Sequence, residues 1–249
     1  MAAGWLTPEL AGKWLVLAFC VALLWLVRRS HRRLPKLRKI PGFQVFDEAL
    51  GRCAELGRPV LFTSGASGMA NETVGSFPML AYVARGAARL NLELLVPVCD
   101  AGVYPIQEAI TRESYAAEGQ GSMYQPDQVR YIPDQNVYAV GTAGWIERAR
   151  AGATFLLGWF GYESLIIAEG GIHAGAYQIG GSSIYFQIPF FVCTCDYVVI
   201  GEEYFAASAY LLQDPPKMAS LVAQDWMKLA LWIIGLAGAA LQTLHAVRP

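Results

Sequence analysis

Short apolar runs alternate with longer mixed segments through the middle of the chain, and this alternation constrains the fold most strongly. Apolar runs such as 92–98 and 197–200 are continuous, which is typical of strands buried on both faces of a parallel sheet. The predicted strands are 59–63, 92–98, 129–132, 154–158, 177–180 and 197–200. The predicted helices are 43–55, 77–90, 104–118, 136–150, 162–169, 184–193 and 202–212. The sequence therefore predicts an α/β domain, with a mainly parallel sheet of about five or six strands and helices on both faces, a Rossmann-like arrangement.

The N-terminal segment is apolar and is followed by a dense basic cluster. Residues 14–27 form an unbroken apolar run, and residues 10–27 contain one charge, Lys13, over roughly 27 Å of helix. Seven of the 19 basic residues then fall within 28–39, and we expect them to contact lipid: Arg28, Arg29, Arg32, Arg33, Lys36, Arg38 and Lys39. Basic residues mark the cytoplasmic end of a membrane helix, so the pattern predicts an anchor with its N-terminus outside. The alternatives are a buried core helix and, for the basic run, a nucleic-acid patch.

A second apolar segment lies near the C-terminus. Residues 229–247 span roughly 28 Å as a helix and include a small-residue face at 235–240. The predicted organisation is an N-terminal transmembrane anchor (1–28), a basic juxtamembrane linker (29–42), a cytoplasmic α/β domain (43–213), a linker (214–227) and a C-terminal transmembrane helix (228–249). This plan predicts a two-pass protein of a prokaryotic cell membrane, with both termini outside.

Composition excludes several classes of protein. The five cysteines include no C-x-x-C pair, which argues against a disulfide scaffold or a zinc finger. The net charge of −1 gives no overall attraction to nucleic acid, and the hydrophobic fraction of 55% is too high for intrinsic disorder.

Two Gly- and Ser-rich segments are candidate ligand-binding loops, because backbone N–H groups at the start of a helix can hold an anion. The candidates are Ser64, Gly65, Ser67 and Gly68 after the first strand, and Gly180, Gly181, Ser182 and Ser183 at the end of the fifth. Neither segment matches G-x-G-x-x-G or a P-loop, and the first contains no Lys or Arg. An ordinary turn, or a serine N-cap, is the structural alternative.

Catalytic candidates are few. Glu163 stands in an otherwise apolar run, so it is either a site residue or a carboxylate with a structural partner. His173 follows Glu169, but two ligands are fewer than a metal site needs, so no metal and no cofactor is predicted. No G-x-S-x-G or H-E-x-x-H motif occurs, which disfavours an enzyme.

Four stretches resemble a known family. They are LELLVPVCD (92–100), LLGWFGYESLIIAEGG (156–171), QIGGSSIYFQIPFFVCTCDYVVIGEEYFAASAYL (178–211) and DPPKMASLVAQDWMK (214–228). They look like a bacterial and archaeal membrane-protein family described only as a domain of unknown function, over roughly residues 55–228. The resemblance implies the two-anchor plan and carries no catalytic residue.

Three functions follow from these observations. The first is a membrane-anchored structural or assembly subunit that self-associates into a large homo-oligomer, with lipids, itself and other membrane subunits as its partners and no nucleic acid. The second is an enzyme or sensor that binds a nucleotide or another small anion at the strand-end loops. The third is a transport or pore subunit, which the lack of a central charge in either apolar segment disfavours.

Overall fold

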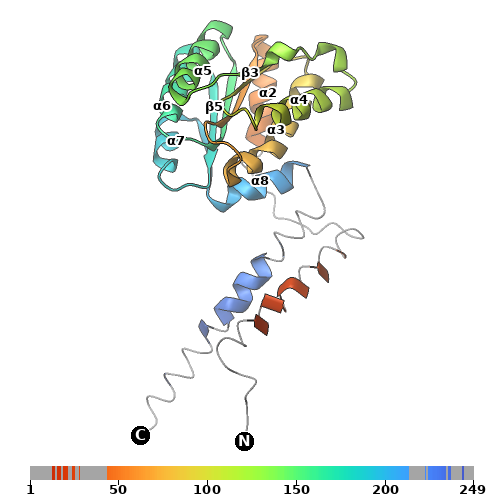
Figure 1. Cartoon of the computed structure of the whole chain (residues 1–249), viewed down its shortest axis with the longest axis vertical. Coiled ribbons are helices and arrows are strands. Elements are labelled where there is room, and N and C mark those ends of the chain that lie inside the picture. The colour runs from red at the N-terminus through yellow and green to blue at the C-terminus, as the bar shows by residue number, and fades with distance from the viewer. Residues whose placement is uncertain are drawn as a thin grey trace, which may run out of the picture. The chain divides into compact units, whose positions relative to one another are not determined.

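The computed structural model describes residues 13–14, 16–17, 19–21, 24–25, 28, 44–212, 222, 224–233, 235–236 and 243. The chain divides into two compact units, Lys39–Leu212 and the terminal segments Met1–Arg38 with Gln213–Pro249. The first unit contains the α/β fold (Figure 1). Its elements are α2 (Gln44–Leu56), β1 (Val60–Gly65), α3 (Asn71–Arg89), β2 (Leu94–Val98), α4 (Tyr104–Ala117), the 3₁₀ helices η2 (Gly121–Met123) and η3 (Pro126–Gln128), β3 (Val129–Tyr131), α5 (Gln135–Ala149), β4 (Ala153–Trp159), α6 (Glu163–Ala174), β5 (Tyr177–Ser182), α7 (Ile188–Thr194), β6 (Tyr197–Ile200) and α8 (Glu202–Leu212).

The six strands form one parallel sheet in the order β3-β2-β1-β4-β5-β6. The chain builds outward from β1 to β3, returns to β4 beside β1, and then builds outward on the other side. The strand order therefore reverses between β1 and β4, and this switch point is where open α/β sheets hold their ligands. The predicted α/β class with a parallel sheet is confirmed.

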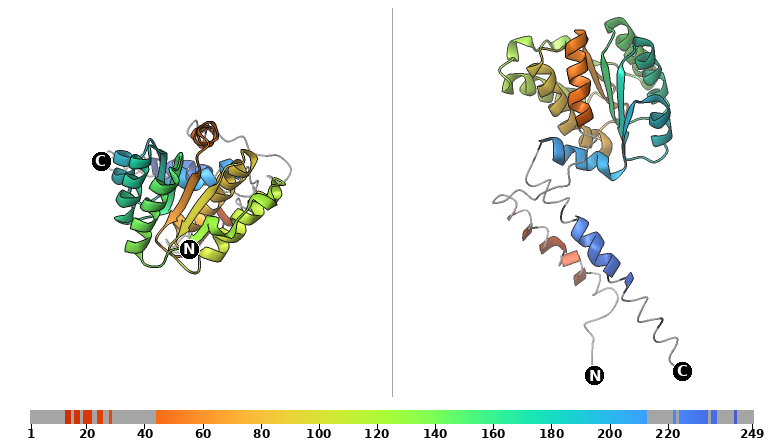
Figure 2. Two further views of the ribbon diagram at one scale, coloured as in Figure 1. Left: turned by 90° about the horizontal axis from the view of Figure 1, so that it is seen from above. Right: turned by 180° about the vertical axis from the view of Figure 1, so that it is seen from behind.

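Helices cover both faces of the sheet (Figure 2). Alternate strand residues face opposite helix layers. Phe62 of β1 and Phe155 of β4 face the core formed with α2, α3, α4 and α8. Leu61 and Leu156 face the core formed with α5, α6 and α7. The central strands are buried along their length because both faces are covered, which explains their unbroken apolar sequences.

Several elements extend beyond their predicted bounds, as α6 does by continuing to Ala174. β5 continues to Ser182, so Gly181 and Ser182 lie inside the strand with Gly180, and the prediction that the strand ends at Gly180 is wrong. Glycine is required at this position because a Cβ on Gly180 would lie 2.7 Å from the Phe191 ring. α3 begins at Asn71 rather than at residue 77, because the small polar side chains of Thr73 and Ser76 fill buried helical positions that an apolar pattern does not reveal.

The prediction of two transmembrane helices is wrong for the part of the chain that the structure describes. No helix among these residues is both long enough and apolar enough to cross a membrane. Of the basic cluster only Arg28 is described, and it is exposed; residues 29–43 lie outside the described residues. The predicted lipid contacts, membrane location and orientation stay predictions.

Candidate functional site

The carboxyl ends of β1 and β4 meet backbone to backbone at the switch point. Gly65 has a φ of +88°, and a Cβ there would lie 1.7 Å from the carbonyl oxygen of Trp159. The N–H of Ala66 donates to that same carbonyl oxygen, at 3.2 Å. On β4, a Cβ on Gly158 would lie 1.9 Å from the carbonyl oxygen of Ser64. Only glycine permits this approach, so the two glycines bring the polar groups at both strand ends together.

Ser64, the residue before Gly65, forms a buried polar pair with α4. Nε2 of Gln107 donates to Oγ of Ser64 at 2.6 Å, and both side chains are almost completely buried. The other amide atom, Oε1 of Gln107, has no hydrogen-bond partner among the described residues. A buried carbonyl oxygen without a donor is energetically unfavourable, so this atom is suited to accept a hydrogen bond from a ligand or from water.

A second buried polar pair, formed by two hydroxyls, lies on the α5 side of the same strand end. The hydroxyls of Thr63 and Tyr138 are hydrogen-bonded to each other, and the N–H of Gly65 also donates to Oγ1 of Thr63. Burial raises the pKa of Tyr138 well above its usual value, and the nearby Cys99 and Glu163 raise it further, while the bond to Thr63 opposes the rise. Tyr138 is therefore a neutral hydrogen-bonding group throughout the physiological pH range.

Glu163, the catalytic candidate, begins α6 and is fully buried. Its Oε1 accepts from the N–H of Gly161 at 2.8 Å, and its Oε2 accepts from Nε2 of Gln135 at 2.7 Å. A carboxylate is favoured at the N-terminus of a helix, and both of its oxygens have neutral donors. These contacts give Glu163 a structural role that needs no reaction.

Carboxylates gather at this edge of the sheet. Burial raises the pKa of Cys99, and the nearby Glu163, Asp100 and Asp134 raise it further. Oδ1 of Asp100 accepts from two N–H groups at the start of α4, and Oδ1 of Asp134 does the same at the start of α5. Residues 44–212 contain 8 Arg and no Lys against 17 Asp and Glu, a net charge of −9, and residues 151–212 contain no Lys or Arg. The edge is therefore electrostatically unfavourable for a phosphate.

The start of α3 has the same negative character. Glu72 lies in the first turn of α3, and its Oε1 accepts from Oγ of Ser183 at 2.6 Å. The hydroxyl of Thr73 donates to the carbonyl oxygen of Ser67 at 3.4 Å, and Gly68 lies against the carboxylate of Asp100. Residues of both predicted loops thus lie near the first turn of α3 and next to the carboxylates of Glu72 and Asp100.

His173 lies apart from this cluster. Its Nδ1 is 3.0 Å from Oε1 of Glu147 on the exposed surface between α6 and α5, and Glu169 is not its partner. Within the described residues, no three His, Cys, Asp or Glu side chains form a group that could hold a metal ion.

Sequence reasoning missed the amide groups of the site. Gln107 and Gln187 are fully buried with unpaired polar atoms, whereas the buried Gln178 is fully bonded. No sequence pattern distinguishes these three glutamines, since their partners lie far away in the chain. The net charge of residues 44–212 was the one available signal, and it pointed away from an anionic ligand.

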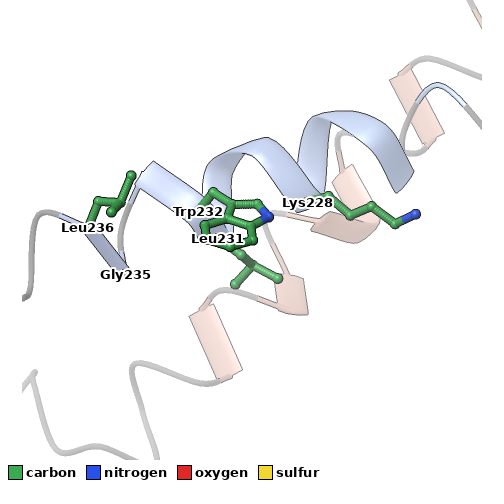
Figure 3. A pocket seen from close by; sticks show the side chains of 5 residues that line it. All are labelled: Lys228, Leu231, Trp232, Gly235 and Leu236. Carbon is green, nitrogen blue, oxygen red and sulfur yellow. The ribbon is translucent and has the colours of Figure 1, made fainter.

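A pocket of about 380 Å³ lies in the other unit, beside the described helical residues 228–233 and 235–236 (Figure 3). Its described lining is Lys228, Leu231, Trp232, Gly235 and Leu236. The lining is apolar apart from Lys228 and contains no nucleophile or acid–base pair, so the pocket suggests no chemistry of its own.

Comparisons with known proteins identify the family but no activity. No curated protein and no solved structure shows significant similarity to the chain. One family model matches residues 6–248, which extends the predicted resemblance over 55–228 into both terminal segments. Because the match covers nearly the whole sequence, the chain belongs to the family described as "Domain of unknown function (DUF6754)".

Proposed function

We propose that the α/β domain binds a small, polar, uncharged ligand at the carboxyl edge of its sheet, beside the β1–β4 switch point. The observation that carries the proposal is the buried Gln107 carbonyl oxygen, which has no partner among the described residues although its amide nitrogen is held by Ser64. The strand order supports the location, because ligands of open α/β sheets bind where the order reverses.

The charge of the edge favours an uncharged ligand over a nucleotide or another anion. Asp100, Asp134 and Glu163 all lie close enough to Cys99 to raise its pKa. The loops that follow β1, β2, β4 and β5 contain no Lys or Arg. A phosphate placed there would meet carboxylates and no compensating cation, whereas a ligand with hydroxyl or N–H donors could pair with their oxygens.

Ligand-dependent stabilisation of the full-length chain tests the proposal. The probes are free sugars, nucleosides, amino acids, nucleotides and inorganic phosphate, each screened by the midpoint of thermal unfolding. A probe present at about 100 times its Kd should add about 2.7 kcal/mol to the free energy of unfolding. That corresponds to a rise of about 5–10 °C for a domain of this size.

Two variants make the screen specific. Gln107→Met should abolish the shift, because it removes the unpaired carbonyl oxygen and the bond to Ser64. Gln178→Met should bind normally, since this glutamine is buried against Ala168, Thr194 and Thr154 within the fold. The proposal fails if no probe shifts the midpoint, or if Gln107→Met responds like the unmodified chain.

Self-association is a second candidate function, and the exposed apolar side chains on α5 and α6 favour it. Val140 of α5 is 65% exposed and Ile172 of α6 is 58% exposed. Val137 and Leu165 are also exposed on these helices. Apolar side chains that gather on one face mark association surfaces. The pore alternative depended on the two membrane helices and is not proposed.

The native mass of the full-length chain tests self-association. An assembly well above 27.2 kDa supports it, and Val140→Glu should lower that mass by placing a charge in the contact. A monomer at all accessible concentrations contradicts it.

A further inference from the structure

Gln187 is fully buried just before α7, and its side chain has no hydrogen-bond partner among the described residues at either Oε1 or Nε2. Its backbone is well held, since its N–H donates to the carbonyl oxygen of Ile184 and its own carbonyl accepts from the N–H groups of Phe190 and Phe191. The main chain therefore fixes the residue while the carboxamide stays unsatisfied. An amide buried in this way needs both a donor and an acceptor supplied from outside the described fold.

Gln187 lies in the connection that leaves the carboxyl end of β5, the strand beside β4. The following helix, α7, packs close to this edge of the sheet. Its Phe191 contacts Phe160 edge-on, with ring centroids 5.6 Å apart, and Phe160 comes directly after β4. The contacts of Phe191 therefore hold the start of α7 near the end of β4, which is one of the two strands of the switch point.

The unpaired donor and acceptor of the Gln187 carboxamide indicate which class of ligand would fit. A glutamine side chain pairs through two hydrogen bonds with an edge that presents a donor beside an acceptor, as it does with adenine. Each nucleobase has such an edge. A phosphate or carboxylate could accept from Nε2 but would leave Oε1 unpaired, and it would also meet the carboxylates of this edge.

We infer that the ligand of the proposed site is a neutral nucleoside whose base pairs edge-on with the Gln187 carboxamide. This inference rests on the proposed function and adds the ligand class. Tyr185 and Phe186, two residues before and directly before Gln187, are 83% and 58% exposed. Exposed aromatic rings stack on bases with little regard to sequence, so they suit the same ligand. Gln187 is fully buried, so pairing with a base requires the segment 183–187 to move outward first.

The experiment uses the full-length chain and measures Kd by calorimetry for adenosine, guanosine, cytidine and uridine, for their 5′-monophosphates, and for ribose. At least one nucleoside should bind, its monophosphate should bind more weakly, and ribose should not bind. Gln187→Met should weaken the nucleoside about tenfold or more by removing a two-bond pair. Gln178→Met is the matched control, a buried glutamine with its own partners, and should bind normally.

Each other outcome has a defined meaning. If no nucleoside binds but another uncharged probe of the earlier screen does, and Gln107→Met abolishes that binding, then the nucleoside inference is wrong and the proposed function stands. If nothing binds, both are wrong. A monophosphate that binds more tightly than its nucleoside overturns the inference, and so does normal nucleoside binding by Gln187→Met.

Discussion

Two buried glutamines of opposite hydrogen-bonding status provide a direct energetic test of the candidate site. Gln178 of β5 donates from Nε2 to the carbonyl oxygens of Ala168 and Thr194, both at 3.0 Å, and its Oε1 accepts from the Thr154 hydroxyl at 3.3 Å. Gln187 has no partner at either amide atom among the described residues. Methionine matches glutamine closely in length and volume, so replacement by methionine removes polarity with little change in packing.

The two substitutions should change stability in opposite directions. Gln178→Met removes three hydrogen bonds at about 1 kcal/mol each, and we expect it to lower the free energy of unfolding by about 3 kcal/mol. Gln187→Met removes an unsatisfied buried amide, and we expect it to raise the free energy of unfolding by about 1–3 kcal/mol. At about 2–4 °C per kcal/mol, the first midpoint should fall by about 6–12 °C and the second should rise by at least about 2 °C.

The assay is urea unfolding of the full-length chain, followed by circular dichroism and by tryptophan fluorescence. Equal m-values for the three proteins would show that the same surface unfolds in each case. The reasoning is refuted if Gln187→Met lowers stability as much as Gln178→Met does. That result would mean that the Gln187 amide is already satisfied in the native protein, and that it is not kept for a ligand.

Three further predictions concern the strand ends and the core. Gly65→Ala should lower the free energy of unfolding by about 4 kcal/mol or more, because the added Cβ would overlap the Trp159 carbonyl oxygen. Gly57→Ala is the control, since Gly57 also has a positive φ, of 63°, but a Cβ there would have no other atom within 4 Å. It should cost about 1–2 kcal/mol in the same urea titration. A thiol reagent at pH 8 should label the exposed Cys20 and Cys193 rapidly and leave Cys53, whose pKa burial raises to about 12, unlabelled until the chain unfolds. Rapid labelling of Cys53 in the folded chain, located by peptide mass, would contradict this. Burial raises the pKa of Tyr138, so the native chain keeps a proton that the unfolded chain loses above about pH 10. The free energy of unfolding should therefore fall as the pH rises above about 10. Tyr138→Phe should reduce the slope of this fall by about 1.4 kcal/mol per pH unit.

The membrane prediction depended on composition. Apolar counts over residues 10–27 and 229–247 measure average hydropathy, whereas a membrane span needs a helix that is both long and apolar. No helix among the described residues meets both conditions.

The candidate site could be located only in part from the sequence. The predicted ends of strands one and two place Ser64 and Asp100 at the carboxyl edge, because the carboxyl ends of parallel strands meet at one edge of the sheet. Glu163 was singled out because it interrupts an apolar run, and it is indeed buried. The end of the fifth strand was placed too early, at Gly180, because glycine favours turns locally, whereas β5 continues to Ser182 and Gly180 makes room for the Phe191 ring.

The sequence alone determined that this chain forms an α/β domain, since strands buried on both faces must be apolar along their length and helices must be apolar on one side. All six strands of the sheet overlap runs that the sequence marks. The tertiary structure decided the strand order, and with it the switch point between β1 and β4. It also decided that Gln178 is satisfied while Gln187 is not. A buried glutamine finds its partners among residues that only the fold brings near, so no local pattern can reveal which amide is left unpaired.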